Sequence, residues 1–409
     1  MLKIVKNKKK IINDPVFGFI TLPSEFIYDL LQHPYVHRLT RIKQLGLTSY
    51  VYPGTQHTRF QHSLGALHLM TEAVTTLRKK GNEITDAEAD AVYAAILLHD
   101  IGHGPFSHTL EDFFFDGISH EEVGLAIIKR MNTEFEGRLD TTIEILQNTY
   151  PKHFLHELVS GQLDMDRLDY LRRDSFFSGV SEGNIGSARI IKMLNIKDGK
   201  LVVEAKGIYS IENFLMTRRL MYWQVYYHKT VFASDTMVYQ TLKRARYVER
   251  NGGELLATPS LKYFLKEPAE KLTPEALDKF MNIDDSDVWV ALKAWCDSSD
   301  KVLAMLSDGI VNRHLFHIEI SNTPFDKSIV EQKTEAICNA YGINRKDAEY
   351  LIVENKVSNH MYNGGETAID ILYGNGTTKS IAEASDMFDV SVLERKITKY
   401  YLSYYKIEN

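Results

Sequence analysis

The sequence predicts a mainly α-helical protein with a small α+β lobe near its C-terminal end. Apolar residues recur at helical spacing through residues 57–80 and again through 86–99. Short apolar runs beside glycine turns, which are typical of strands, gather after about residue 310. The chain has 409 residues, enough for a large core with an appended lobe. We therefore expect a helical domain over 1–309 and an α+β lobe over 310–409.

Two helices are predicted within the first hundred residues. The first, over 57–80, places apolar side chains on one face at intervals of three or four residues. These side chains are Leu64, Leu67, Met70, Val74 and Leu77. The second, over 86–99, starts with acidic residues, which suit a helix N-terminus, and stops where Gly102 and Gly104 follow.

Three further helices are expected in the middle of the chain. They span residues 154–175, about Ser210 to beyond His228, and about 286–308. The helical period of the first of them assigns Leu158, Leu168 and Leu171 to the core.

Turn residues predict the strands. The pair Asp198-Gly199 favours a tight turn, so a small hairpin is expected over 198–207. In the C-terminal lobe, strands are predicted at 315–320 and within 368–384, the latter folded around glycines. A helix over 327–341 should separate them.

Composition and charge exclude several classes of protein. The net charge of −6 argues against nucleic acid as the main partner, because phosphate backbones require clustered cations. Cys296 and Cys338 form no C-x-x-C pair, so a thiolate zinc site is not expected. No apolar run approaches the length of a membrane span, and the basic start lacks the apolar segment of a signal peptide. We therefore expect a soluble, cytoplasmic protein without membrane contacts.

The segment LLHDIGHGPFSH (97–108) indicates a metal site. It follows an apolar helix and contains His99 and Asp100. Neighbouring side chains on a continuing helix diverge by about 100°, so a sharp turn is needed to aim both at one point. The glycines that follow permit such a turn.

Two other segments offer further metal ligands and charged groups. HTRFQHSLG (57–65) contains Arg59 and His62, three residues apart and so on one helical face. LDMDRLDYLRRD (163–174) offers Asp166, and also Tyr170 and Asp174, at spacings of four. The set His62, His99, Asp100 and Asp166 combines imidazoles with carboxylates. It suits one divalent ion of Mn, Fe, Co, Ni or Zn and leaves positions for water and substrate.

These motifs carry a family resemblance. H…HD…D with HDIGHGPFSH resembles the HD-domain superfamily. QLGLTSYVYPGTQHTRFQHSLG (44–65) and DMDRLDYLRRD (164–174) resemble its deoxynucleoside triphosphate (dNTP) triphosphohydrolases, including those with a sterile-alpha-motif domain in front. The resemblance extends from INDP (12–15) to about YYHK (226–229). It implies an HD-domain helical core, and no sterile-alpha-motif domain is expected because that core begins almost at Met1.

The resemblance implies hydrolysis of a dNTP to deoxynucleoside and triphosphate, with Mg²⁺ able to accompany the nucleotide phosphates. Arg59 suits the α-phosphate and Arg167 the outer phosphates, because fixed cations stabilise developing charge. A proton for the leaving 5′-oxygen would come from His108 or His120, with Glu111 or Glu121 orienting the imidazole. His103 either supports the site or ligates a second metal.

The sugar and base contacts are implied by the resemblance alone. Tyr170 matches the residue that closes on the sugar and disfavours a 2′-hydroxyl. Asp174 and Gln44 match groups that hold the 3′-hydroxyl, and Arg218 and Tyr226 match phosphate and sugar contacts. Leu45 is also predicted to bind the substrate.

Related enzymes also bind a regulatory nucleotide between subunits. Five residues match parts of that surface: Asn13, Arg189, Lys206, His228 and Lys229. The positions that read guanine differ from the best-known branch, where they are acidic, Gln and Arg. Here they are Gln32, His37 and Thr40, and one basic phosphate contact is Glu204. We therefore expect a homo-oligomer, a dimer or tetramer, that is activated by a nucleotide other than a guanine nucleotide or by none.

Two alternatives stay open at this point. The first is an HD-domain phosphohydrolase or phosphodiesterase that acts on another nucleotide or on single-stranded nucleic acid. The second is a nucleotide-sensing protein that has kept the fold and lost turnover. The intact set of four ligands counts against the second alternative, and substrate profiling distinguishes the first.

Overall fold

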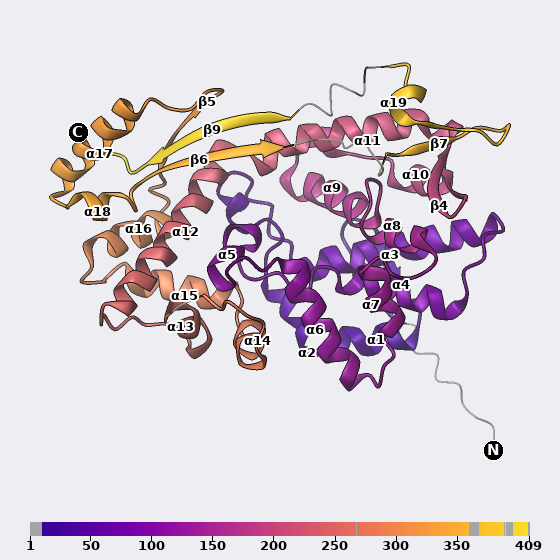
Figure 1. Ribbon diagram of the computed structural model, residues 1–409, viewed down its shortest axis with the longest axis horizontal. Helices are drawn as coiled ribbons and strands as arrows, with labels where there is room; N and C mark the ends of the chain where they lie inside the picture. Colours follow the sequence, from indigo (N-terminus) through magenta and orange to yellow (C-terminus); the bar gives the residue numbers. More distant parts are fainter. Residues whose placement is uncertain (1–9, 267, 360–367, 388, 390–395, 408–409) are drawn as a thin grey trace.

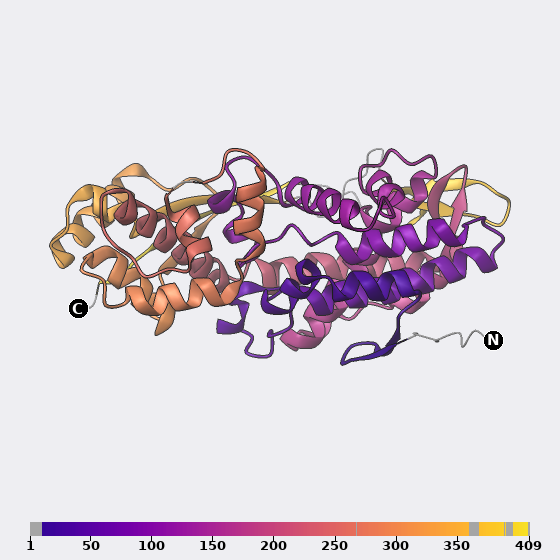
Figure 2. The same ribbon diagram turned by 90° about the horizontal axis from the view of Figure 1, so that it is seen from below.

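Helices form most of the structure, and the long helix α12 joins two groups of them (Figure 1). The computed structural model describes residues 10–266, 268–359, 368–387, 389 and 396–407. The first group contains α1–α4 and α6–α11, and the second contains α13 and α15–α18. Figure 2 shows that the two groups lie end to end in an elongated molecule. The predicted mainly helical fold is confirmed.

The first half of the chain contains α1 (Glu25–Gln32), α2 (Pro34–Arg38), α3 (Arg59–Lys79), α4 (Asp86–Leu98), α5 (Glu111–Phe114), α6 (His120–Glu134), α7 (Asp140–Leu146), α8 (His153–Val159), α9 (Met165–Ser178), α10 (Ser187–Met193) and α11 (Ile208–Met221). The second half contains α12 (Lys229–Arg250), α13 (Pro259–Lys266), α14 (Pro274–Met281), α15 (Asp285–Trp295), α16 (Lys301–Val311), α17 (Lys327–Tyr341), α18 (Arg345–Ala348) and α19 (Ile381–Ala384).

In the part of the chain that the structure describes, the strands form three small sheets. They are β1 (Ile11–Asp14), β2 (Gly18–Thr21), β3 (Leu194–Lys197), β4 (Lys200–Glu204), β5 (His317–Ser321), β6 (Ile352–Asn359), β7 (Asp370–Leu372), β8 (Thr378–Ser380) and β9 (Ile397–Tyr404). The first sheet is the hairpin β1-β2, the second has the order β3-β4-β7-β8, and the third has the order β5-β9-β6.

The C-terminal segment contributes to two different sheets. β6 and β9 pair in antiparallel fashion beside the second group of helices. β7 instead pairs in parallel with β4, with Val203 opposite Ile371, at the far end of the first group. The last hundred residues thus extend over both groups of helices. The division of the chain at residues 309 and 310 stays a prediction.

Several predicted elements agree with the structure. The helices expected over 57–80 and 86–99 are α3 and α4, and the helix over 327–341 is α17. The hairpin expected over 198–207 is β3-β4 with its turn at Asp198-Gly199. The strand predicted at 315–320 is β5. The strands predicted within 368–384 are β7 and β8, but the last four residues of that segment form α19.

The single helix predicted over 154–175 is wrong, because the chain breaks at residues 160–164 into α8 and α9. Asp164 has an extended backbone and accepts a hydrogen bond from the Arg167 amide at 2.7 Å. It therefore caps a new helix instead of continuing the old one. The three leucines assigned to this core, Leu158, Leu168 and Leu171, are fully buried.

Two other predicted helices are also interrupted. The helix expected from Ser210 beyond His228 is α11, a π-helical turn at Tyr222–Tyr226, and then α12 after a break at Tyr227. The helix expected over 286–308 is α15 followed by α16, because Asp300 caps α16 through the Leu303 amide. Periodic apolar residues on both sides of a short break predict one helix where two are present.

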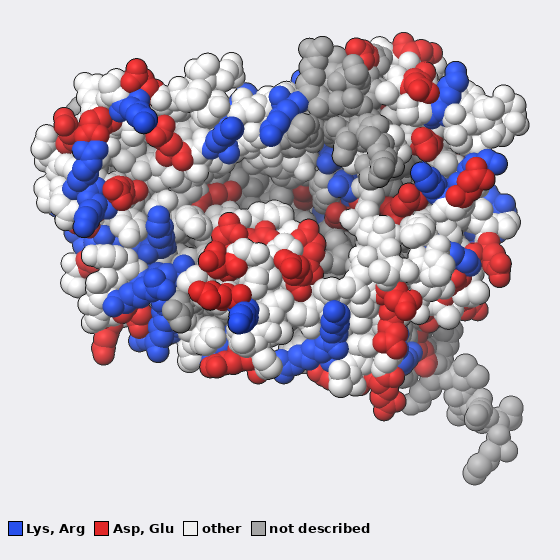
Figure 3. All heavy atoms as spheres, in the orientation of Figure 1, with Lys and Arg blue, Asp and Glu red and all other residues white. Residues whose placement is uncertain are grey.

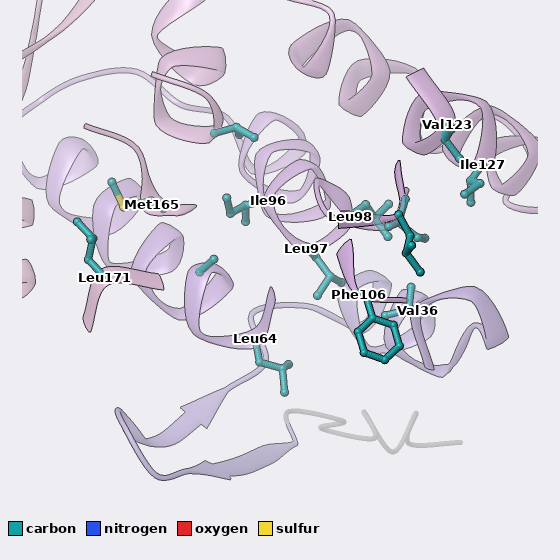
Figure 4. Packing of buried hydrophobic residues seen from close by; sticks show 14 of the residues in the cluster. Val36, Leu64, Ile96, Leu97, Leu98, Phe106, Val123, Ile127, Met165 and Leu171 are labelled. Atoms are coloured by element: carbon teal, nitrogen blue, oxygen red, sulfur yellow. The ribbon is translucent and has the colours of Figure 1, made fainter. Parts of the chain in front are cut away.

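A continuous hydrophobic core holds the helix that precedes His99 and Asp100. α4 is buried along almost its whole length, including Ile96, Leu97 and Leu98. Figure 4 shows Leu97 and Leu98 between Leu64 of α3 and Val123 of α6. Burying one such leucine contributes about 1.5–3 kcal/mol. The C-terminal end of α4 is therefore fixed where His99 and Asp100 follow.

Candidate active site

Three helices bring the four predicted ligands together. His62 lies in the first turns of α3, whose start is fixed by a capping box between Thr58 and Gln61. His99 is the C-cap of α4, and Asp100 follows it in the turn. Asp166 lies in the first turn of α9. Helix caps and the buried α4 therefore set the positions of all four side chains.

The ligand atoms converge on one point. The Nε2 atoms of His62 and His99 are 3.3 Å apart. Asp166 Oδ1 lies 3.1 Å from His62 Nε2 and 3.5 Å from His99 Nε2. Asp100 Oδ2 lies 3.6 Å from His62 Nε2, and Asp100 Oδ1 lies 3.4 Å from His99 Nε2. Two imidazole nitrogens and two carboxylates around one point match the nitrogen and oxygen ligands of a divalent transition metal.

The other ring nitrogen of each histidine is held by the protein. His62 Nδ1 bonds Asp169 Oδ2 at 2.7 Å, and His99 Nδ1 bonds the Ile96 carbonyl oxygen at 2.7 Å. Such outer contacts fix the ring and leave Nε2 to face the ligand point, as is usual for metal-binding histidines. The residues present therefore fit a divalent cation.

The charges at this point also call for a cation. Burial alone would lower the pKa of His62, but hydrogen bonds to Asp166 and Asp169 raise it to about 10. Burial alone would raise the pKa of Asp166, but hydrogen bonds from His62 and His99 hold it far below its usual value. Positive charge beside these carboxylates therefore stabilises their ionised form, and a divalent ion at this point would act in the same way.

Arg59 lies at the edge of this centre. Its Nη1 donates to Asp100 Oδ2 at 2.5 Å, and its Nε and Nη2 donate to Ser107 Oγ at 2.9 and 2.6 Å. The guanidinium is buried beside a proposed ligand, where it can face an anion held by the metal. Its role toward the α-phosphate stays a prediction, and the contact with Ser107 was not predicted.

The predicted histidine cluster is assembled next to the ligands. The rings of His103 and His120 stack with centroids 3.9 Å apart. His103 Nε2 lies 3.4 Å from Asp100 Oδ1. Gly102 permits this arrangement, because a Cβ there would lie 2.0 Å from the His120 carbonyl oxygen. The glycine turn thus sets His120 beside the proposed metal centre.

The contacts of Glu111 distinguish between the two candidate proton donors, His120 and His108. Its Oε1 lies 2.8 Å from His120 Nδ1, while its Oε2 is 3.4 Å from His108 Nδ1. The His108 side chain is 71% exposed and the His120 side chain 20% exposed. Glu121 lies 3.3 Å from His120 Nε2 and is 70% exposed. Of the predicted pairs, His120 with Glu111 has the geometry of an oriented general acid.

The predicted sugar residues lie along α9 and beside it. The buried Asp174 accepts a hydrogen bond from the Tyr226 hydroxyl at 2.7 Å and lies 2.7 Å from His57 Nε2. Tyr170, one turn before Asp174, has its ring 6.2 Å from that of Tyr226. Tyr226 ends the π-helical turn, a feature that often occurs at functional sites. His57 was missed by sequence reasoning, although it belongs to the same HTRFQH segment.

The remaining predicted substrate residues have unused polar atoms. Gln44 Oε1, Arg167 Nε and Arg218 Nε are buried and have no hydrogen-bond partner among the described residues. Arg167 Nη1 donates to Asp164 and to the Gly161 carbonyl oxygen. Unused donors on two arginines favour an anionic ligand at this end of α9. Leu45, beside Gln44, is the N-cap of a 3₁₀ turn.

Comparison with known proteins agrees with this geometry. Models of the HD domain and of the HD associated region match residues 59–174 and 185–258. A solved structure of a phosphohydrolase from Bacteroides thetaiotaomicron is 55% identical to this chain, with a TM-score of 0.95. The similarity covers 98% of this chain and 100% of that chain. The chain belongs to the HD-domain family of phosphohydrolases.

Other HD-domain relatives differ in how much they cover. Protein YwfO of Bacillus subtilis is 31% identical over 98% of this chain and 93% of its own length. The human deoxynucleoside triphosphate triphosphohydrolase SAMHD1 is 28% identical over 62% of this chain and 47% of its own length. The chain thus spans about half the length of SAMHD1. The family predicted from the motifs is confirmed.

The residues predicted to bind a regulatory nucleotide lie in separate places of this HD-domain chain. Arg189 Nη2 donates to the Lys206 carbonyl oxygen at 3.1 Å, so these two are neighbours. His228 and the exposed Lys229 lie beyond the other end of α11, a helix of 14 residues that spans roughly 20 Å. Asn13 lies in the hairpin β1-β2.

Glu204, which stands where a basic phosphate contact was expected, has a structural partner in this protein. Its Oε1 accepts a hydrogen bond from Lys80 Nζ at 2.7 Å, and Lys80 also donates to the Leu194 carbonyl oxygen. Glu204 therefore belongs to an ion pair that holds α3 against the hairpin β3-β4, where the sequence comparison placed a phosphate contact. Gln32, His37 and Thr40 lie on α1, on α2 and in the turn after α2.

Acidic side chains gather in the middle of one face, over α5 and the start of α6 (Figure 3). The exposed members of this group are Asp112, Asp116, Glu121 and Glu122. The exposed carboxylates disfavour a phosphate backbone at this patch. The expectation that nucleic acid is not the main partner stays a prediction. Within the described residues, no helix is both long and apolar enough to cross a bilayer.

The raised pKa of Asp235 on α12 should make the free energy of unfolding depend on pH. Burial raises its pKa to about 7, although a hydrogen bond with Thr109 lowers it. An unfolded aspartate titrates near 3.9, so the folded chain binds more protons between about pH 4 and 7. Stability therefore falls as pH rises through this window. Asp235→Asn should raise the free energy of unfolding by about 2 kcal/mol more at pH 8 than at pH 5.

Denaturant unfolding at the two pH values checks this expectation. The matched control is Asp29→Asn on the exposed side of α1, which should change stability equally at both. An equal gain for Asp235→Asn at pH 5 and pH 8 would contradict a raised pKa at Asp235.

Proposed function

We propose that this protein is a metal-dependent dNTP triphosphohydrolase, which converts a dNTP and water to a deoxynucleoside and triphosphate. The observation that supports it best is the arrangement along α9. Asp166 faces the ligand point, and Tyr170 and Asp174 follow at one and two turns. A site for metal and phosphate is thereby continuous with a site for a sugar hydroxyl. The similarity to SAMHD1 supports the same assignment.

The residues present provide for each part of this reaction. A divalent metal held by His62, His99, Asp100 and Asp166 would lower the pKa of a bound water and polarise a phosphoryl oxygen. In the proposed reaction the water oxygen would bond to the α-phosphorus as the bond from phosphorus to the 5′-oxygen breaks, and the proton lost by the water would replace the one that the 5′-oxygen gains. The developing phosphate charge is proposed to be neutralised by Arg59, Arg167 and Arg218.

The leaving 5′-oxygen needs a proton. His120 is proposed to donate it, because Glu111 Oε1 lies 2.8 Å from its Nδ1 and holds the ring in one orientation. Asp174 is proposed to accept a hydrogen bond from the 3′-hydroxyl. Its two current partners, His57 and Tyr226, hold the carboxylate in place from both sides.

Product analysis tests the proposal. The protein should be incubated with each dNTP and Mn²⁺, and the products separated by chromatography. We expect inorganic triphosphate and deoxynucleoside in equal amounts. Pyrophosphate with deoxynucleoside monophosphate would exclude the 5′-oxygen as leaving group. Turnover of nucleoside monophosphates or single-stranded oligonucleotides without turnover of dNTPs would favour another HD-domain activity.

Tyr170 should influence the choice of sugar. Tyr170→Ala is expected to reduce the preference for dNTP over rNTP by about tenfold, because a filter based on shape discriminates only modestly. Overall activity should also fall. The measurement is kcat/KM for one dNTP and the matching rNTP, with Tyr209→Ala, an exposed residue on α11, as control. An unchanged ratio would assign Tyr170 to the structural core.

We also propose that the active form is a dimer or tetramer with a nucleotide between subunits. Since α11 separates Lys206 from Lys229 in one chain, a shared phosphate cradle requires the two ends from different subunits. Cations from separate chains gather stably only around an anion, which would also stabilise the oligomer. Light scattering with and without each dNTP checks the assembly. Initial rates for pairs of dNTPs check activation, and a monomer with additive-independent rates would contradict it.

A further inference from the structure

A buried chain of charged groups connects the N-terminal hairpin to His62. His62 Nδ1 bonds Asp169 Oδ2 at 2.7 Å. Arg173 donates to both oxygens of Asp169, with Nε at 2.9 Å from Oδ2 and Nη2 at 3.0 Å from Oδ1. Arg173 Nη1 then donates to Asp14 Oδ2 at 2.8 Å. Asp14 is the last residue of β1, far from the ligands in sequence.

The chain is closed to water and tightly enclosed. The side chains of Arg173, Asp169 and His62 are 0% exposed, and that of Asp14 is 3% exposed. Gly65 of α3 leaves the space for it, because a Cβ there would lie 1.9 Å from Asp169 Oδ1 and 2.1 Å from Arg173 Nη2. Buried ion pairs are costly to leave incomplete, so each member depends on the next.

Asp14 has two separate tasks. Its Oδ1 accepts hydrogen bonds from the Val16 and Phe17 amides at 2.9 and 3.0 Å, which closes the turn of the hairpin. Its Oδ2 contacts Arg173. The guanidinium of Arg173 also lies 5.7 Å from the Phe17 ring centroid. The turn of the hairpin is thus built around the outer end of the buried chain.

The charges explain why the outer end matters. Asp14 and Asp169 carry two negative charges and Arg173 one positive charge, so the three together keep one negative charge behind His62. Without Asp14, Arg173 would be balanced by Asp169 alone. The Asp169 carboxylate would then be drawn toward the guanidinium and would bond His62 less strongly. A histidine ligand with a weakened outer hydrogen bond is less well oriented and less basic.

We propose that Asp14, Arg173 and Asp169 are positioning residues that couple the N-terminal hairpin to the metal ligand His62. This inference rests on the metal centre of the proposed function. It assigns the hairpin β1-β2 a role in metal affinity, although none of its residues reaches the ligand point. Because coupling between two sites is reciprocal, metal binding should in turn stabilise the hairpin turn.

Asp14→Asn separates the two tasks of Asp14. The amide oxygen can still accept from Val16 and Phe17, while the amide nitrogen replaces the acceptor that faces Arg173. Titration calorimetry of the metal-free protein with Mn²⁺ should show affinity reduced about tenfold, the lower end of the effect for outer-contact variants. Saturating Mn²⁺ should restore kcat, with KM for substrate unchanged. Asp29→Asn is the matched control and should bind Mn²⁺ as the unmodified protein does.

Gly65→Ala tests the chain without touching any charge. Alanine is favoured over glycine within a helix, so a local effect alone would leave metal binding intact or stabilise the protein. Displacement of Asp169 and Arg173 should instead weaken Mn²⁺ binding about tenfold. This variant keeps the test decisive if Asp14→Asn unfolds.

Hydrogen exchange provides the reciprocal measurement. Mn²⁺ should slow exchange of the Val16 and Phe17 amides in the unmodified protein, and should slow it less in Gly65→Ala. The coupling would be overturned if both variants bound Mn²⁺ as tightly as the unmodified protein, or if Mn²⁺ did not change the exchange rates of the hairpin amides. Either result would leave the metal centre itself intact. Failure of the unmodified protein to bind Mn²⁺ would instead overturn the metal centre and with it the proposed function.

Discussion

Asp166→Ala should abolish hydrolysis, with kcat/KM reduced at least about 1000-fold, while the protein stays folded. The variant removes one of two carboxylates from the ligand point, and residues that act as a unit in catalysis lose most of their effect together. Asp166 begins α9 but does not cap it, since Asp164 does. The helix should therefore keep its start. Mass spectrometry measures the metal content of the variant, and circular dichroism measures whether it is folded.

The matched control for this variant is Asp29→Ala, which removes an exposed carboxylate from α1. It should retain both metal content and activity. Near-normal metal content and activity in Asp166→Ala would remove Asp166 from the site. Loss of structure in Asp166→Ala would leave Asp166→Asn, which keeps the shape of the side chain, to report on its charge.

His120→Ala should lower kcat by about 10²–10⁴, the usual contribution of a general acid, without changing metal content. His120 is oriented by Glu111 and stacked on His103, so its proton is aimed in a fixed direction. The expected rates are for steady-state hydrolysis of a dNTP under saturating Mn²⁺. A triphosphate substrate whose leaving oxygen is more acidic than a 5′-hydroxyl should lose less activity, because that oxygen needs less protonation by an acid.

The loss of kcat in His108→Ala is compared with that in His120→Ala to decide which histidine is the proton donor. His108 is mostly exposed and its contact with Glu111 is long, so the expected loss is less than about tenfold. Equal losses in the two variants would indicate that the cluster acts as a unit. A larger loss in His108→Ala would reverse the assignment of the proton donor.

The convergence of the proposed ligands could be predicted because the chemistry limits their types and their spacing. His62, His99 and Asp166 belong to residue classes that bind metals, and each lies on a helix whose periodicity is plain. The buried chain behind them was missed for a physical reason. Asp169 and Arg173 are four residues apart, which in a sequence is the pattern of an ordinary surface ion pair. Only tertiary packing shows that this pair is buried.

The fold was predictable where contacts are local. The helices at 57–80 and 86–99 follow from periodicity and capping residues. The break at 160–164 was missed, because a cap such as Asp164 also fits inside a helical pattern. The strand β9 and its long pairing with β6 depend on residues far apart in the chain, where no local signal reports the partner.

The parallel pairing of β4 with β7 has a consequence for biosynthesis. The hairpin β3-β4 is complete long before Ile371, which pairs with Val203, leaves the ribosome. At the usual 5–20 residues per second, β4 would have an open hydrogen-bonding edge for roughly ten seconds or more. An unpaired edge is a template for pairing with other chains. Nascent chains of this protein should therefore be vulnerable to aggregation until the final strands are synthesised, and a chaperone that shields β4 would favour its folding.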